Sequence, residues 1–393
     1  MTPPPLIAAT LYAPKERPIW LIPSLLFDGE KLQPDRAILF DKNGVVSRMA
    51  SAKILLAKRK LMQSLHAKPP SIQKWAGTAA PGLFDVQVNG GGNVMFNTTP
   101  TFEGIRQIIA AHRARGTAWI LPTFITDEIE AMQQAAAAII TAWQQQIDGF
   151  AGVHFEGPHI NPIRKGAHKA EFIRPFAEST MNIMRELRAY DIPVMLTLAP
   201  ECVAPGVIAE LTRLGVVVSL GHSEASENDV RRAISEGARA VTHLFNAMSG
   251  LQSREPGLVG TALDSDLICG VIADLHHVAA TSLRLAIRAR PAANLMMLVS
   301  DAMPSLGGSD HFTLYGETIR VAEGKLVNQA GSLAGAQIDL AQSVMNMVTA
   351  EMTDQETALA MATRIPAQLM GVWPRIGRLD IGTNDVTLLP NLG

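Results

Sequence analysis

Apolar and polar positions follow a regular order along most of the chain. From about residue 80, eight short runs of apolar and β-branched residues each end in a polar, often glycine-bearing segment, as buried parallel strands do. Longer segments between them, such as TFEGIRQIIAAHRAR at 101–115, have the spacing of helices that cover a sheet. The runs are GLFDVQVNG, TAWILPTFIT, FAGVHFEGPH, IPVMLTLAPE, GVVVSLGHS, ARAVTHLFNA, LICGVIADLHHV and LMMLVSDA. This pattern predicts an α/β fold, a (β/α)8 barrel of the TIM type.

The two ends of the chain have a different pattern. Segments 19–29 and 36–50 have the character of short strands in a hairpin with a turn at 42–44, and segment 377–390 has the same character. We therefore predict that residues 1–79 and 373–393 build one small β-sandwich domain from both chain termini, while residues 80–372 build the barrel. Segment 52–63 has the spacing of a basic amphipathic helix, which we interpret as a solvated surface helix.

Polar side chains follow the barrel runs at the same end of each run. In this kind of barrel the active site is built at the carboxyl ends of the strands, so we expect these side chains to meet at one mouth. Contact with solvent explains one or two of them, but poorly explains a set so rich in His, Asp and Glu. The set is Gln87, Asn89, Thr123, Glu156, Glu201, His222, His243, His277 and Asp301.

The stretch HFEGPHINPIRKGAH at 154–168 contains three of the chain's ten histidines and one glutamate. Residues two apart share a face of a strand, so we expect His154 and Glu156 to point into the barrel, with Glu156 at the mouth. His222 and His243 end the fifth and sixth runs. Two imidazoles and one carboxylate are typical of a catalytic zinc site, which keeps a fourth position for water. A metal-activated water is a ready nucleophile.

Three further residues suggest chemistry. Asp301 closes the eighth run, where we expect it to move a proton; a carboxylate that only orients a metal ligand is the alternative. His168 lies on the loop after the third run and could polarise a substrate carbonyl, although a lone loop histidine is more often a surface residue. Arg254, near Asn246 and His277, suggests an anionic substrate because Arg binds phosphate through paired hydrogen bonds. Without these neighbours, we would interpret Arg254 as one partner of a surface ion pair.

Composition and charge exclude several classes of protein. The chain has 393 residues with a net charge of -2, which argues against nucleic acid or an anionic membrane as a partner. Cys202 and Cys269 are the only cysteines, so the chain has no disulfide framework and no cysteine-rich zinc site. No apolar run approaches about 18 residues, and the N-terminal segment is interrupted by prolines and charges where a signal peptide would be apolar. We expect a cytoplasmic protein that does not bind membranes.

The motifs at these positions occur in a characteristic order. PGLFDVQVNG, HFEGPHINPIRKGAH, LAPE, SLGHS, THLFNAM followed by REPG, GVIAD, LVSDA and GSLAG together span nearly the whole chain. In this combination the sequence resembles the N-acetylglucosamine-6-phosphate deacetylase family of the amidohydrolase superfamily. The resemblance implies hydrolysis of N-acetylglucosamine 6-phosphate to glucosamine 6-phosphate and acetate by a metal-activated water.

The resemblance also implies roles for individual residues. Glu156, His222 and His243 match the metal ligands, Asp301 matches the general acid and base, and His168 matches the histidine that helps to polarise the acetamide carbonyl. A second set matches the residues that hold the phosphate and the sugar, and in the family the Arg of this set reaches the neighbouring site of a homodimer. The members of this set are Asn246, Ala247, Arg254 and His277.

The end of the first run differs from that of many amidohydrolases, and this difference predicts how many metal ions each subunit binds. The run carries Gln87-Val88-Asn89 where a His-x-His pair often binds a second ion, and amides are poor ligands for such an ion. We therefore predict one divalent metal per subunit, with Gln87 in a hydrogen bond to the nucleophilic water. Zinc is the first choice, and iron, cobalt or manganese are the alternatives because His and carboxylate ligands suit all of them.

Other departures leave the substrate open. The segment ADLHHV lacks the family's glycine after Asp274, Ala336 replaces a frequent serine, and the C-terminal strand region is short. N-acetylgalactosamine 6-phosphate is therefore an alternative substrate, and register favours His277 over His276 as the residue that faces inward. A cyclic amide or an N-acyl amino acid is a further alternative, against which Arg254 and its neighbours argue. A metal-free sensor of sugar phosphate would have no need for the acid and base.

Overall fold

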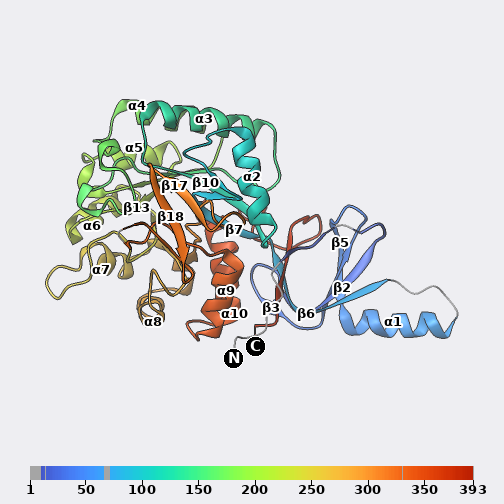
Figure 1. The fold of residues 1–393 in the computed structure, drawn as a ribbon. Helices are drawn as coiled ribbons and strands as arrows, with labels where there is room; N and C mark the ends of the chain where they lie inside the picture. The colour runs from blue at the N-terminus through green and yellow to red at the C-terminus, as the bar shows by residue number, and fades with distance from the viewer. Residues whose placement is uncertain (1–9, 14, 66–70, 330, 393) are drawn as a thin grey trace.

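The computed structural model describes residues 10–13, 15–65, 71–329 and 331–392. Eight parallel strands follow one another in chain order around a barrel, and each predicted run contains one of them (Figure 1). The barrel strands are β7 (Leu83–Val88), β10 (Thr117–Ile125), β11 (Val153–Glu156), β12 (Val194–Leu198), β13 (Val217–Leu220), β14 (Ala240–Val241), β15 (Ile268–Val271) and β16 (Met296–Leu298). The predicted (β/α)8 fold is confirmed.

Helices cover the outside of the barrel with their apolar faces turned inward. In α2 the buried Ile105, Ile108 and Ile109 lie on one face at helical spacing, and the hydroxyl of Thr101 accepts the N–H of Gly104 to begin the helix. The barrel helices are α2 (Phe102–Arg113), α3 (Ile129–Gln144), α4 (Glu178–Ala189), α5 (Val207–Arg213), α6 (Glu227–Ser235), α7 (Gly257–Leu263), α8 (Ala280–Ala289), α9 (Leu340–Thr349), α10 (Gln355–Met361) and α11 (Arg364–Leu369). None of the described helices is both long enough and apolar enough to cross a bilayer.

The barrel closes where its first strand meets the segment after its last strand. The N–H of Asp301 donates to the carbonyl of Gln87 at 3.0 Å, and the N–H of Asn89 donates to the carbonyl of Ala302 at 2.9 Å. The buried carboxyl group of Asp85 accepts the N–H of Ser300 from the other side of this seam, at 3.2 and 3.3 Å. Burial raises the pKa of Asp85 to about 7, although these hydrogen bonds lower it. The seam therefore places the end of β7 beside Asp301.

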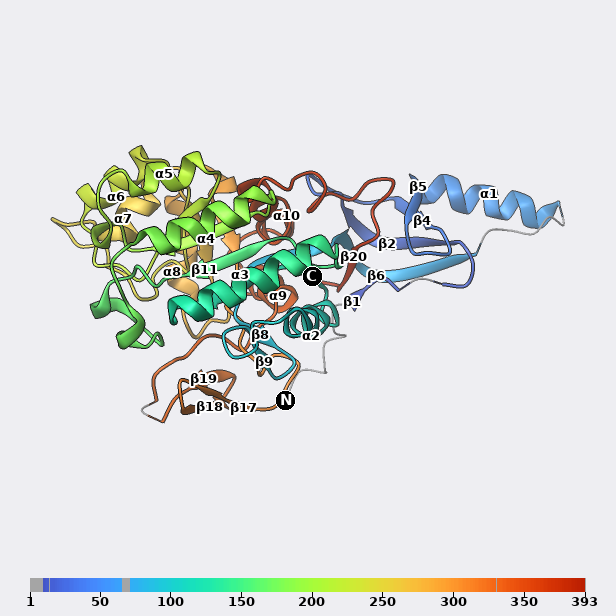
Figure 2. The same ribbon diagram turned by 90° about the horizontal axis from the view of Figure 1, so that it is seen from above.

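A seven-stranded sheet combines strands from both ends of the chain. Its order is β1-β20-β6-β2-β4-β5, with β3 beside β2. The strands are β1 (Thr10–Leu11), β2 (Ile19–Phe27), β3 (Leu32–Gln33), β4 (Arg36–Phe40), β5 (Val46–Ser51), β6 (Ile72–Pro81) and β20 (Val386–Pro390). Helix α1 (Ala52–Ser64), expected from the sequence, packs on the sheet through Ala52 and Leu55. Figures 1 and 2 show the sheet on one side of the barrel with α1 outermost. The precise domain limits stay a prediction.

A small antiparallel sheet between β16 and α9 was not predicted from the sequence. It consists of β17 (His311–Leu314), β18 (Glu317–Ala322) and β19 (Lys325–Val327), and Figure 2 shows it standing out from the barrel near β8 (Gly90–Gly91) and β9 (Val94–Met95). Its Leu314, Ile319 and Leu326 form a buried cluster with Met95 and with Ile125 at the carboxyl end of β10. The insertion, residues 303–339, therefore borders the mouth of the barrel.

Gly82 joins the sheet from the chain ends to the barrel, and it has no room for a side chain. A Cβ at this position would lie 2.3 Å from the Cβ of Ala118 and 3.0 Å from that of Asp385. We predict that Gly82→Ala destabilises the protein by about 1–3 kcal/mol through overpacking. Thermal melting measures the loss. Gly250→Ala is the matched control, because a Cβ on this exposed glycine meets nothing within 4 Å; equal melting temperatures for the two variants would contradict the prediction.

Candidate active site

Glu156, His222 and His243 converge at the carboxyl ends of β11, β13 and β14. Glu156 Oε1 lies 3.1 Å from His222 Nε2 and 2.9 Å from His243 Nε2, and the two Nε2 atoms are 3.1 Å apart. All three side chains are buried. Within the described part of the chain, they form the group of His, Cys, Asp or Glu side chains whose ligand atoms are close enough together to hold a metal ion.

The surroundings of these residues suit a divalent metal. Nδ1 of His222 lies 2.8 Å from the carbonyl oxygen of Arg164, so Nδ1–H donates to this oxygen and the Nε2 lone pair faces the centre of the cluster. Burial opposes ionisation of Glu156, but hydrogen bonds from His222 and His243 hold its pKa well below the usual value. Burial lowers the pKa of His243, and Glu156 more than offsets this and raises it. One carboxylate and two imidazoles around one point match the ligands of a catalytic zinc site.

Several site residues have left-handed backbone conformations. The φ angles are 49° at His222, 31° at His243 and 50° at Asp301. Each of these residues follows a barrel strand by two or three positions, and the change of backbone direction turns its side chain toward the mouth. A residue other than glycine in this conformation costs on the order of 1–3 kcal/mol. The rest of the fold must supply this energy.

Asp301 lies at the centre of a polar network built by the end of β7. Gln87 Nε2 donates to Glu156 Oε2 and to Asp301 Oδ1, in both cases at 3.2 Å. Asn89 Nδ2 donates to the same Asp301 oxygen at 2.6 Å. Burial and the charge of Glu156 raise the pKa of Asp301 to about 6, despite the opposing effects of His243 and Asn89. A carboxyl group with this pKa can both accept and return a proton near neutral pH.

Asn89 belongs to the strand-end polar residues, and the sequence alone predicts no role for its amide. Its spacing of two from Gln87 was the available signal, because residues two apart lie on one face of a strand. In the structure both amides reach Asp301.

His168 is buried, with 4% of its surface exposed, which contradicts the alternative that it is a surface residue. Its Nδ1 lies 2.7 Å from Thr126 Oγ1, and its ring centroid lies 4.4 Å from that of His222. Burial, together with the nearby His222, lowers the pKa of His168 to about 3. Its imidazole is therefore neutral at neutral pH.

These side chains border one pocket of about 200 Å³. Asn246, Ala247 and His277 line it together with Asp301, His168 and the metal-ligand candidates. Gln87 and Arg254 do not line it, and neither do Thr123 and Glu201 of the strand-end set. His277 is held by Asp274 Oδ2, 2.6 Å from its Nδ1, whereas His276 is exposed. The strand register predicted that His277 rather than His276 faces inward, and His277 lines the pocket.

Other predicted and unpredicted residues lie around this pocket. Arg254 is exposed on the loop between β14 and α7, outside the pocket of its own chain. Met303, Leu333 and Gly335 of the insertion also line the pocket. None of them was predicted as a site residue, although Leu333 and Gly335 belong to the GSLAG motif; Met303 is an apolar residue without a chemical signal.

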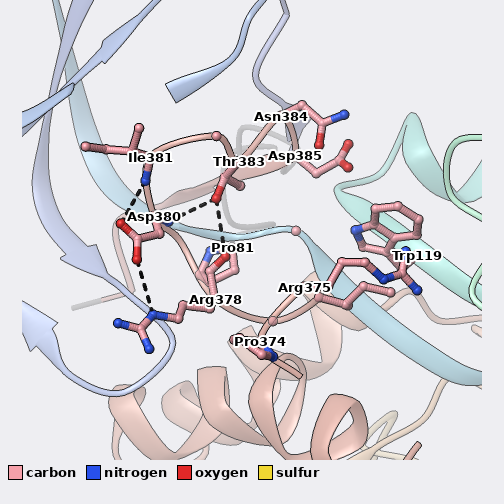
Figure 3. Close-up of a pocket in the computed structure, with 14 residues that line it drawn as sticks. Pro81, Trp119, Pro374, Arg375, Arg378, Asp380, Ile381, Thr383, Asn384 and Asp385 are labelled. Atoms are coloured by element: carbon pink, nitrogen blue, oxygen red, sulfur yellow. Dashed lines mark hydrogen bonds and ion pairs between the residues drawn. The ribbon is translucent and has the colours of Figure 1, made fainter. Parts of the chain in front are cut away.

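A second cavity, of about 380 Å³, lies at the opposite end of the barrel, where β7 and β10 begin (Figure 3). Arg375 lies over the ring of Trp119, 5.7 Å from its centroid, and Arg378 pairs with Asp380 at 3.6 Å. None of the predicted site residues lines this cavity. Its size alone does not make it the site of chemistry.

Comparison with known proteins identifies the family of the chain. The model of the amidohydrolase family matches residues 78–384. The N-acetylgalactosamine-6-phosphate deacetylase of Shewanella sp. (strain ANA-3) is 43% identical over 322 residues, 80% of each chain. The N-acetylglucosamine-6-phosphate deacetylase of Bos taurus is 36% identical over 320 residues, which cover 78% of this chain and 77% of the bovine protein. The crystal structure of the N-acetylglucosamine-6-phosphate deacetylase from Pasteurella multocida superposes with a TM-score of 0.86 and 28% identity, and covers 95% of this chain and 96% of that one.

The barrel and its mouth define a hydrolytic (β/α)8 enzyme. The chain belongs to the amidohydrolase family, whose members typically depend on a metal.

The metal-ligand candidates lead to a binding prediction. We expect apo protein to bind one zinc ion per chain in a calorimetric titration, and His243→Asn to weaken binding by more than about 10-fold, because even loss of a residue that only orients a ligand costs this much. His276→Asn, at an exposed position outside the pocket, is the control and should bind as the wild type does. A second tight equivalent, or unchanged affinity in His243→Asn, would show that the site is assigned wrongly.

Proposed function

We propose that this enzyme removes the acetyl group from N-acetylglucosamine 6-phosphate and releases glucosamine 6-phosphate and acetate. The observation that carries the proposal is the convergence of a candidate metal site, an acid and base, and a neutral histidine donor in one pocket. The similarity to deacetylases that act on such substrates supports it. The cytoplasm, where such small phosphorylated sugars are found, is the proposed compartment.

Glu156, His222 and His243 are the proposed ligands of one divalent ion, with zinc as the first choice. When bound, such an ion would act as a Lewis acid and would lower the pKa of a water molecule toward neutrality. Gln87 and Asn89 occupy the positions where a second ion would need histidines, and both donate to Asp301 instead. This arrangement supports a site for a single metal.

The protein's own residues divide the remaining steps. Asp301 accepts a proton from the attacking water and returns it to the nitrogen of the leaving amine. His168 donates a hydrogen bond to the acetamide oxygen, where negative charge develops during the attack. Gln87 is the proposed hydrogen-bond partner of the water. Both proton transfers then pass through one carboxyl group.

Asn246, Ala247 and His277 are the proposed partners of the sugar and the phosphate from within the chain. Arg254 is exposed and outside the pocket, as expected for a residue that enters the site of a neighbouring subunit. We therefore propose a homodimer in which Arg254 binds the substrate phosphate of its partner. Analytical ultracentrifugation tests the dimer.

N-acetylgalactosamine 6-phosphate is the second candidate substrate. The 43% identity to a deacetylase of this epimer exceeds the 36% to the bovine glucosamine enzyme, and the unusual segment around His276 and His277 lies at the edge of the pocket. Both substrates require the same chemistry at the acetamide. They differ only in the orientation of one hydroxyl group.

Acetate release by zinc-loaded enzyme tests the proposal. We predict turnover of at least one of the two phosphorylated epimers, with kcat/KM for unphosphorylated N-acetylglucosamine lower by at least about 100-fold because charge-assisted hydrogen bonds to the phosphate are lost. The ratio of kcat/KM for the two epimers identifies the preferred substrate. If the metal is bound and neither epimer is hydrolysed, the proposed substrate is wrong.

The role of Asp301 predicts a pH dependence. The carboxylate form must accept the proton, so activity should fall as the pH drops through the pKa of about 6. Asp301→Asn should lower kcat by about 10²-fold or more, as expected for loss of a general acid and base, with the metal content unchanged. Asp310→Asn, on an exposed residue of the insertion, is the control. Substantial kcat in Asp301→Asn would favour the alternative role of orienting a ligand.

A further inference from the structure

We propose that Thr126 and Tyr315 are positioning residues that decide which nitrogen of His168 carries the proton. In this arrangement His168 has its proton on Nε2. The catalytic consequence rests on the proposed function, whereas the protonated nitrogen can be measured without any substrate.

The hydroxyl and the backbone N–H of Thr126 together specify the tautomer, and the hydroxyl makes the shorter contact. The backbone N–H can only donate, and it faces His168 Nδ1 at 3.4 Å. The Thr126 hydroxyl lies 2.7 Å from the same nitrogen and can donate as well. A nitrogen that accepts hydrogen bonds cannot carry a hydrogen of its own in the neutral ring. The proton of His168 is therefore on Nε2.

The position of the Thr126 hydroxyl is closely constrained. Thr126 is buried, with 1% of its surface exposed. A Cβ on Gly157 would lie 2.2 Å from Thr126 Oγ1, so only glycine at this position leaves room for the hydroxyl. Gly157 directly follows Glu156, whose carbonyl oxygen lies 3.4 Å from the hydroxyl and competes for its single hydrogen. His168 Nδ1, at 2.7 Å, is the nearer acceptor. The group that orients His168 is thus packed against the strand that carries a metal-ligand candidate.

Tyr315 connects this arrangement to the inserted sheet. It lies in the turn between β17 and β18, and its hydroxyl donates to the carbonyl oxygen of Thr126 at 2.5 Å. Its ring lies 6.1 Å from that of Phe172, on the same loop as His168. Tyr315 therefore contacts Thr126 directly, and it contacts the loop that carries His168 through Phe172. This gives the insertion a role in the geometry of the site.

The tautomer has a direct chemical consequence. A neutral imidazole with Nε2–H presents a donor to a carbonyl oxygen that gains negative charge, which stabilises the transition state. The other tautomer would present a lone pair to the same oxygen and repel it. Loss of the Thr126 hydroxyl should therefore lower kcat more than it changes KM.

NMR of protein labelled with ¹⁵N-histidine tests the proposal, because the two ring nitrogens of a neutral imidazole differ in shift according to which carries the proton. His168→Gln identifies the signals of His168. We expect an unprotonated Nδ1 in the wild type, and a population with protonated Nδ1 in Thr126→Val, which keeps the size of the side chain. We expect kcat to fall by about 10-fold in Thr126→Val, less than for a fully removed oxyanion donor, and by a smaller factor in Tyr315→Phe.

The matched controls are Thr141→Val and Tyr190→Phe. Thr141 is exposed on α3 and bonds only within its helix, and Tyr190 is 44% exposed. Both controls should retain the wild-type tautomer and kcat. Zinc content and thermal melting of every variant separate a change at His168 from a failure to fold.

Two results would overturn the proposal. One is a wild-type His168 that is protonated on Nδ1, and the other is a folded Thr126→Val with both tautomer and kcat unchanged. If the tautomer responds as expected while no amino sugar phosphate is hydrolysed, the positioning role stands and the proposed function is wrong.

Discussion

The seam between β7 and the segment after β16 is the contact on which the site depends. Backbone hydrogen bonds of Gln87 and Asn89 and the buried carboxyl group of Asp85 hold it together. Residues that are more than 200 positions apart in the chain, such as Asn89 and Asp301, are brought into hydrogen-bond contact by this closure. Without it the amides of Gln87 and Asn89 would lose their hydrogen bonds to Asp301, and the barrel would have an open edge.

Several features at the mouth of the barrel are energetically unfavourable, and interactions in the rest of the molecule must offset their cost. Left-handed backbone at His222, His243 and Asp301, and buried charge at Glu156, each cost free energy. Below the mouth, polar side chains inside the barrel are joined by hydrogen bonds: His154 lies 2.7 Å from the Thr197 hydroxyl, which lies 2.6 Å from that of Thr242. Burial lowers the pKa of His154 to about 4. This histidine, two residues before Glu156, is a neutral structural residue.

Much of the fold and of the candidate site could be predicted because both depend on periodicity. Buried parallel strands produce continuous apolar runs, and a barrel places the residue after each run at one mouth. That reasoning selected Glu156, His222, His243 and Asp301, which are within one pocket. The insertion of β17–β19 was not predicted, although its strands HFTL and ETIRVA alternate polar and apolar residues and are separated by a glycine-bearing turn. The role of Thr126 could not be predicted, because it depends on one contact across 42 positions.

The order of the barrel strands and helices follows from the sequence alone, as do the end of the barrel that carries the chemistry and the types of side chain available there. These properties follow from local patterns that each residue shares with its neighbours along the chain. The folded structure was needed to show which side chains touch, that Asp274 holds the imidazole of His277, and that Arg254 lies outside the pocket. Contacts of this kind depend on backbone direction at strand ends and on packing between distant segments, and no local pattern encodes them.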